Sequence, residues 1–352
     1  MKKLFLFLVM LLWAGGAWAT YPSYTVCPSG CDYNTLNGAV ADLEANHATP
    51  ASPVTITISG SWSSPDTTAV SISGLTTTST NTLTITTTGS ARHNGTWSST
   101  GYRLIYSTAI SNTTPIFITS NQGYIIIDGL QIQMTNVGYS GIACIKQDDS
   151  GFSGNYLTIK NNILVGVDSG GIAGGIIINN NGTGGFSIIN YIYNNVIYGG
   201  SGNGISIVDE SNIVNDIYNN TIYGTATGFN ISSQETLINN IANNNLTDYS
   251  GTPGTHSNNI SQDTSSPDSV YRSKTVSFVN TGSYNFNLAT NDTSATGQGA
   301  NESGVFTTDI TGATRTVPWD IGAFKATAII ISPHTELFSN GNLYSKGNLY
   351  VQ

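Results

Sequence analysis

An internal repeat constrains the fold of this chain more than any other feature of its sequence. Residues 192–199 (IYNNVIYG) return 25 residues later as 217–224 (IYNNTIYG), and the two copies differ only at Val196 and Thr221. Fainter Asn-Asn copies lie 33 residues before the first copy and 20 residues after the second. A repeat of this length is too short to bury its own apolar face, so the copies are expected to stack as coils of a solenoid.

Each coil carries a second short element that begins with glycine. Its copies place apolar residues one and three positions after the glycine: 141–144 (GIAC), 175–178 (GIII), 204–207 (GISI) and 228–231 (GFNI). Alternation with a period of two is typical of a strand with one buried face. The pattern predicts that Cys144 is a small interior hydrophobe in register with Ile178, Ile207 and Ile231.

The repeated asparagines have a structural explanation. Asparagine tolerates the left-handed backbone conformation of tight corners, and stacked asparagine side chains can hydrogen-bond from coil to coil. We therefore interpret most of them as part of the scaffold. The same repeat places Tyr193 over Tyr218 and Tyr198 over Tyr223, in pairs that are expected to point outward about 4.8 Å apart.

The first coils and a capping helix are predicted upstream of the repeats. Residues 54–58, 70–72 and 83–86 alternate apolar and polar side chains, which indicates strands. Before them, the apolar residues Leu36, Ala39, Val40 and Leu43 follow helical spacing after a cap at Asn34. We expect a helix over residues 34–46 that covers the open end of the solenoid and protects its strand edges.

The N-terminus has the features of a secretory signal peptide. Lys2 and Lys3 precede an apolar run over residues 4–13, and Ala17-Trp18-Ala19 ends the segment. Cleavage after Ala19 would make the mature protein secreted, extracellular or attached to the cell surface. No later stretch is long and apolar enough to predict a membrane span in the mature chain. In an oxidising compartment, a disulfide between Cys27 and Cys31 is expected across their Pro-Ser-Gly turn.

The charge balance argues against nucleic acid as a partner. The formal net charge of the chain is −9, and removal of Lys2 and Lys3 would make it −11, whereas phosphate binding needs clustered Lys and Arg. Only 9% of the residues are charged, although 39% are hydrophobic. A polar surface made of Asn, Ser, Thr and Gly suits stacked short strands, so an all-β fold is expected.

These features resemble the right-handed parallel β-helix proteins of the pectate-lyase-like superfamily. The resemblance rests on residues 24–40, on 124–130 (YIIIDGL) and on the Asn-Asn coils. The C-terminal part is similar to the closing segment of choice-of-anchor Q domains, and it includes FVN at 278, YNFNL at 284, GQGAN at 297, TDITG at 308, Arg315 and WDIGAF at 319. This likeness implies structural roles for Asp309, Arg315 and Asp320, with a buried Arg–Asp pair.

The expected organisation follows from these signals. Residues 1–19 form the signal peptide, 20–53 the N-terminal segment with its capping helix, and 54–326 the parallel β-helix, which closes with about 276–326. Residues 327–352 form a tail with two GNLY copies, at 341 and 347, to which we assign no role.

The resemblance implies enzymes that cut acidic polysaccharides, but their signatures are mostly missing. Only Asp148-Asp149 matches a hydrolase motif, without the Gly-His-Gly and Arg-Ile-Lys that accompany it. One acidic cluster is a candidate catalytic site: Asp209, Glu210 and Glu235 fall five to seven residues after their strand glycines on neighbouring coils. Such carboxylates could approach the roughly 5 Å spacing of a retaining glycosidase or share a calcium ion. The alternative is a pair of solvated turns.

A break in the strand pattern between Gly89 and Leu104 predicts a loop that could bind a substrate. It contains Arg92, His93, Trp97, Tyr102 and Arg103, and sugar sites often combine aromatic faces with polar and cationic groups. The alternative is that Trp97 and Tyr102 pack onto the coils. The leading hypothesis is a non-catalytic β-helix that binds a polysaccharide or a cell-surface glycan. A polysaccharide lyase or glycoside hydrolase, and a purely structural fibre-like or adhesion module, remain alternatives.

Overall fold

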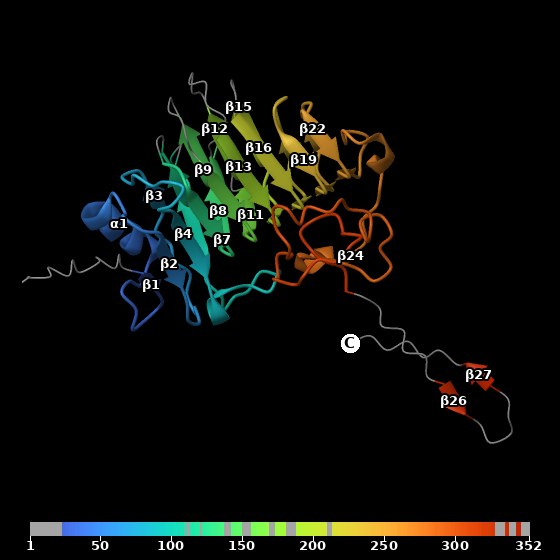
Figure 1. Cartoon of the computed structure of the whole chain (residues 1–352), viewed down its shortest axis with the longest axis horizontal. Helices are drawn as coiled ribbons and strands as arrows, with labels where there is room; N and C mark the ends of the chain where they lie inside the picture. Colours follow the sequence, from blue (N-terminus) through green and yellow to red (C-terminus); the bar gives the residue numbers. More distant parts are fainter. Residues whose placement is uncertain are drawn as a thin grey trace, which may run out of the picture.

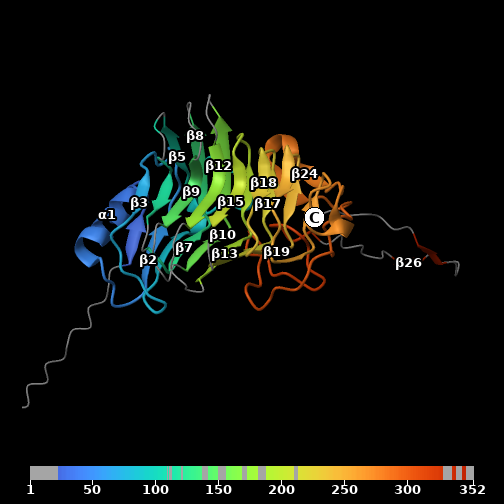
Figure 2. The ribbon, with the colours of Figure 1, turned by 90° about the horizontal axis from the view of Figure 1, so that it is seen from above.

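The strands of this chain stack into a parallel β-helix. The computed structural model describes residues 23–108, 110, 113–119, 122–136, 142–149, 156–168, 173–180, 188–209, 213–327, 335–337 and 343–345. The expected signal peptide of residues 1–19 lies outside this range. Three long sheets, here called A, B and C, contain only parallel pairs, and the chain visits them in turn to complete each coil. Figures 1 and 2 show the coils side by side along the long axis of the molecule.

The strand bounds define the coils. Sheet A consists of β1 (Tyr24–Val26), β2 (Val54–Ile58), β4 (Leu83–Thr87), β7 (Ile125–Asp128), β10 (Leu157–Lys160), β13 (Ile188–Tyr193), β16 (Ile213–Tyr218), β19 (Thr236–Ile238) and β22 (Thr255–Ser257). Sheet B consists of β5 (Leu104–Thr108), β8 (Gln131–Asn136), β11 (Ile163–Asp168), β14 (Val196–Tyr198), β17 (Thr221–Tyr223), β20 (Ile241–Asn243) and β23 (Ile260–Ser261). Sheet C consists of β3 (Val70–Ile72), β6 (Ile116–Ile118), β9 (Ile142–Asp149), β12 (Ala173–Asn180), β15 (Asn203–Asp209), β18 (Thr227–Asn230) and β21 (Thr247–Ser250).

Columns of β-branched side chains fill the interior of the coils. In sheet A, consecutive strands align Ile56, Ile85, Ile127, Ile159, Ile192 and Ile217, each fully buried. Isoleucine suits this position because its branched side chain packs well on a pleated surface. The strands that the sequence predicts at 54–58, 70–72 and 83–86 are β2, β3 and β4, the last extended by one residue.

The Asn-Asn corners have both predicted properties. The first asparagine of each corner between sheets A and B is left-handed, with φ from 49° to 60°, at Asn161, Asn194, Asn219, Asn239 and Asn258. The second asparagine points inward and forms a hydrogen-bonded ladder, with amide-to-amide distances of 3.0 to 3.1 Å, through Asn162, Asn195, Asn220, Asn240 and Asn259. The corners are therefore part of the scaffold.

The predicted register of Cys144 is wrong, although its burial is correct. Ile145 aligns with Ile176, and Gln147 is the residue that faces Ile178. The strands β9 and β12 are each eight residues long and pair through their isoleucines. The glycine motif that starts at 141 is therefore not aligned with the motif that starts at 175. The Cys144 thiol lies within hydrogen-bonding distance of the backbone oxygens of Ile132 and Val165.

Helix α1 (Leu36–His47) lies at the N-terminal end of the solenoid beside β3 (Figure 1). Its buried residues are the four that the sequence predicts: Leu36, Ala39, Val40 and Leu43. The predicted cap at Asn34 is wrong, because the cap is Thr35. Its side chain accepts from the backbone N–H of Gly38 at 3.2 Å.

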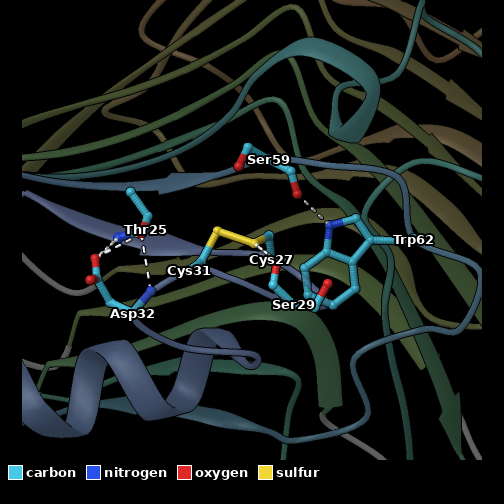
Figure 3. The surroundings of a disulfide bond; sticks show 7 residues. All are labelled: Thr25, Cys27, Ser29, Cys31, Asp32, Ser59 and Trp62. Carbon is cyan, nitrogen blue, oxygen red and sulfur yellow. Dashed lines mark hydrogen bonds between the residues drawn. A yellow bond between two sulfur atoms is a disulfide. The ribbon is translucent and has the colours of Figure 1, made fainter.

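The expected disulfide joins Cys27 to Cys31 next to this end (Figure 3). Asp32 accepts hydrogen bonds from the backbone N–H and the hydroxyl of Thr25, at 2.8 and 2.7 Å. These bonds attach the small disulfide loop to β1.

The chain after β23, here called the C-terminal segment (residues 262–327), packs back over the coils. It contains η2 (Ser269–Tyr271), β24 (Phe278–Asn280), η3 (Thr281–Ser283) and β25 (Asn285–Leu288), and β24 pairs antiparallel with β25. Figure 1 shows it in orange and red alongside the solenoid. Further on, β26 (Thr335–Leu337) and β27 (Leu343–Ser345) form an antiparallel pair. No helix in the described ranges is long and apolar enough to cross a membrane.

The C-terminal segment changes the expected exposure of the tyrosine pairs. Tyr193 aligns with Tyr218, and Tyr198 with Tyr223, as the repeat predicts. The rings of Tyr193 and Tyr198 do not face solvent, however, because Phe306 and Tyr284 stack on them at centroid distances of 4.5 Å. An aromatic surface that the coils alone would expose is therefore mostly a packing interface.

Candidate functional site

The loop that the sequence singles out, here called loop 89–103, leaves sheet A after β4 and returns at β5. Arg92 at its start forms an ion pair with Asp128 of β7, with Nη2 2.8 Å from the carboxylate. The ring of His93 is buried, with Nε2 2.8 Å from the carbonyl oxygen of Asn161, and Nδ1 accepts from the Gly95 N–H. These two side chains attach the loop to the corner between sheets A and B.

The end of the loop is attached in the same way. Tyr102 is fully buried and donates to Asp66 at 3.2 Å. Arg103 is only 5% exposed and donates to the backbone oxygens of Trp62 and Ser98. The structure therefore does not bring the five predicted residues to one binding surface. A loop of this length needs internal anchors, and its cationic and polar side chains supply them.

Trp97 is the residue of this group that borders a groove. The groove has a volume of about 370 Å³, and its lining includes Trp97, Gln133, Val165, Tyr198, Ser283 and Tyr284. This volume is within the range of known ligand sites, about 300–1,000 Å³. We call it the aromatic groove.

The floor of the aromatic groove is the outer face of sheet B. Gln133, Val165 and Tyr198 occupy the same register position on β8, β11 and β14, so their side chains follow one another across three coils. Within the described residues, the Gln133 amide makes one hydrogen bond, from Nε2 to the hydroxyl of Thr135 at 3.4 Å. Among the same residues no hydrogen bond reaches its amide oxygen, which can accept one from a ligand.

Tyr284 of the C-terminal segment also lines the groove, and sequence reasoning missed it as a site residue. Its backbone is left-handed, with φ of 55°, and its ring stacks on Tyr198 with an interplanar angle of 15°. The residue is still 51% exposed, so much of the ring remains accessible. No sequence signal predicts that Tyr284 lies near Trp97, because the two residues come together when the C-terminal segment folds back over sheet B.

Loop 89–103 also contacts the C-terminal segment through buried residues. Trp97 packs against a buried cluster that includes Val165, Tyr198 and Phe324. Gly95, with φ of 91°, lies so close to Phe324 that a Cβ atom there would come within 2.6 Å of the ring. Glycine is therefore needed for the loop to reach the C-terminal segment.

Burial, with the nearby Tyr284 and Cys144 adding to the effect, raises the pKa of Tyr198 well above its ordinary value. The Tyr198 phenol therefore stays protonated and neutral at physiological pH. Since tyrosine, tryptophan and glutamine are all uncharged there, the groove offers ring faces and hydrogen-bonding groups without ionic charge.

The predicted acidic cluster is not a set of neighbouring surface carboxylates in the described residues. Asp209 is the last residue of β15, and Glu210 lies outside the described residues. Glu235 is 0% exposed. Its carboxylate accepts from the Ser232 hydroxyl at 3.0 Å and from the Asn215 amide at 3.5 Å, and Asn215 accepts in turn from Asn190. Glu235 thus ends an interior ladder that starts on β13.

Another carboxylate pair lies on the outer face of sheet A. Asp216 projects from β16 between Tyr191 of β13 and Thr236 of β19. Burial raises its pKa, although hydrogen bonds from Thr236 and Tyr218 oppose the shift. Burial and then repulsion by Asp216 raise the pKa of Glu302 on the C-terminal segment. Both carboxyl groups therefore keep their protons to a higher pH than an ordinary carboxyl group does.

Metal binding has no support in the part of the chain that the structure describes. There, no three His, Cys, Asp or Glu side chains lie close enough together to hold an ion. The calcium that the sequence allows as a cofactor therefore has no described group of ligands.

Comparisons with known proteins show little likeness. No family model matches the chain, and no curated protein matches it. Among solved structures, the chain is similar to a pectate lyase, Pel9A, with a TM-score of 0.29 and 13% identity. That comparison covers 87% of this chain and 96% of the other. We assign the fold from the strand register of this chain itself, which shows a parallel β-helix.

Proposed function

We propose that this protein is a secreted or cell-surface β-helix that binds a glycan in the aromatic groove without cleaving it. The observation that carries the proposal is that Trp97 and the half-exposed Tyr284 line the same open groove. Aromatic rings offer large, rigid contact surfaces, and convergent hydrogen-bonding groups fix the orientation of a ligand. In this proposal residues 1–19 direct secretion, and residues 276–326 form a closing segment of the choice-of-anchor Q kind.

The test is retention of polysaccharides by the purified mature protein, for example by affinity electrophoresis. Trp97→Ala and Tyr284→Ala should each weaken retention about fivefold or more, because each removes a stacking surface worth roughly 1 kcal/mol. Tyr271→Ala is the matched control, since Tyr271 is also a partly buried tyrosine of the C-terminal segment but lines a different depression. Equal retention by all three variants and the wild type would remove the groove from the function.

A second candidate function, glycoside hydrolysis, is favoured by the carboxylates on sheet A. Asp216 and Glu302 both have raised pKa values, which suits a general acid, and partly buried Tyr191 lies beside Asp216. An assay of new reducing ends on a polysaccharide panel tests it. Activity that disappears in both Asp216→Asn and Glu302→Gln would establish hydrolysis, whereas activity that persists in either variant would exclude that carboxylate from catalysis.

A further inference from the structure

We infer that the aromatic groove selects neutral glycan chains over acidic ones. This inference rests on the proposed glycan-binding function and names the class of ligand for the same site. It departs from the acidic polysaccharides that the fold resemblance implies.

The described residues that line the groove supply no positive charge to hold a uronate. None of its nine lining residues is acidic or basic. A carboxylate that enters such a site loses hydration and gains no ionic partner, which is unfavourable by several kcal/mol. A sugar hydroxyl is matched instead, because the amide oxygen of Gln133 can accept from it and the rings of Trp97 and Tyr284 can pack on an apolar sugar face.

The cations of loop 89–103 are already engaged in the scaffold. Arg92 is paired with Asp128 at 2.8 Å, and Arg103 is buried against backbone oxygens. Neither guanidinium belongs to the groove lining. The arginines that could attract a polyanion to this loop are therefore used to hold the ends of the loop on the coils.

A negative charge also lies next to the groove lining. Asp168 is exposed and directly follows Val167, which lines the groove. The chain as a whole carries a formal net charge of −9. A negative field slows the approach of a polyuronate and weakens its binding at low salt, and it leaves a neutral glycan unaffected.

The experiment compares neutral and acidic ligands of equal length on the full mature chain. The probes are cellohexaose, mannohexaose and a hexamer of galacturonate, titrated calorimetrically at low and at 0.5 M salt. We expect at least one neutral hexamer to bind at least tenfold more tightly than the galacturonate hexamer, with Trp97→Ala weakening that binding. In Gln133→Lys, which adds a cation to the floor, the preference should shift toward the acidic hexamer.

Two results would overturn the inference, and they are distinguishable. If the galacturonate hexamer binds as tightly as the neutral ones and Trp97→Ala weakens it, the groove binds glycans but does not select neutral chains. If no hexamer binds, or if Trp97→Ala binds as the wild type does, the glycan-binding function itself fails. Thermal unfolding of each variant establishes that a loss of binding is not a loss of folding.

Discussion

At the scale of single residues, asparagine performs three tasks in this protein. It adopts the left-handed conformation at the corners, and it forms the interior ladder. It also binds the C-terminal segment, because the Asn194 amide donates to the backbone oxygen of Thr308 and the Asn219 amide to the backbone oxygens of Asp320 and Gly322. The first two tasks can be predicted from an Asn-Asn repeat. The third cannot, since it depends on residues more than 100 positions away in the chain.

Asn195→Ala should strongly destabilise the fold. The Asn195 amide donates to the Ile159 oxygen and to Asn220, and its oxygen accepts from the backbone N–H and the amide of Asn162. Removing it leaves buried partners unsatisfied, so we expect a loss of about 2–4 kcal/mol in the free energy of unfolding, measured in urea. The control, Asn301→Ala, changes an exposed asparagine and should have little effect. Similar losses in both variants would contradict the role of the ladder.

His93 should make stability depend on pH. Burial, together with the nearby Arg92, lowers its pKa from 6.5 to about 4. Between these values the unfolded chain binds more protons than the folded one, so stability is fully present above pH 6.5. It then falls by roughly 3 kcal/mol as the pH drops toward 4, and levels off below that.

The measurement is the urea midpoint from pH 7 to pH 4, with His93→Gln as the comparison, because glutamine cannot titrate. The wild type should lose stability more steeply than the variant over this range. Parallel curves would show that the imidazole is not the group responsible.

At the scale of elements, the sequence predicts most boundaries because local pattern decides them. The strands β2, β3 and β4 follow from alternation, and the buried face of α1 follows from helical spacing. A predicted boundary is wrong where two neighbouring residues suit the same position equally well. Asn34 and Thr35 are both good helix caps, and tertiary structure selects Thr35, because Asp66 accepts from the Leu36 N–H and thereby places the start of the helix.

This selection can be tested with two adjacent substitutions. Thr35→Ala removes the acceptor for the Gly38 N–H and should reduce stability by about 1 kcal/mol. Asn34→Ala changes an exposed side chain outside the helix and should change stability by less than half of that. Chemical denaturation of both variants measures the difference. A larger loss of stability in Asn34→Ala than in Thr35→Ala would show that Asn34 caps the helix, as the sequence alone suggests.

At the scale of the whole molecule, the C-terminal segment completes the protein and creates the candidate site. The coils present the tyrosines of β13 and β14 outward, and the segment covers them with Phe306 and Tyr284. Where the segment meets loop 89–103, Trp97 and Tyr284 line an open groove. The sequence identified Trp97 from an interruption of the strand pattern. It did not identify Tyr284 as a groove residue, and it did not predict that Tyr102 and Arg103 are buried. Those outcomes depend on contacts between segments with no shared pattern.

Arg315 holds this arrangement together in a way that differs from the expected Arg–Asp pair. Among the described residues no ion pair involves Arg315, although Asp309 and Asp320 favour its charged form against the burial that lowers its pKa to about 10. The guanidinium donates instead to the backbone oxygens of Asp320 and Gly322 and to the Asn194 side-chain oxygen, at 2.8 to 3.2 Å. Asp309 and Asp320 use their carboxylates to accept backbone N–H groups of the same segment. Arg315 therefore links the segment to the coil at Asn194.

Arg315→Met should weaken the attachment of the C-terminal segment to the coils. Three buried acceptors would lose a charged donor, so we expect a loss of roughly 3 kcal/mol or more in the free energy of unfolding. Limited proteolysis should then cut the chain after residue 275 faster than in the wild type, before the coils are digested. Arg272→Met is the control, because Arg272 is exposed on the same segment and, among the described residues, donates to one acceptor, the Ser266 backbone oxygen. If the two variants are cut at equal rates, the segment is held by its aromatic contacts alone. If Arg315→Met is cut faster and also loses glycan retention, the groove depends on the segment as a wall.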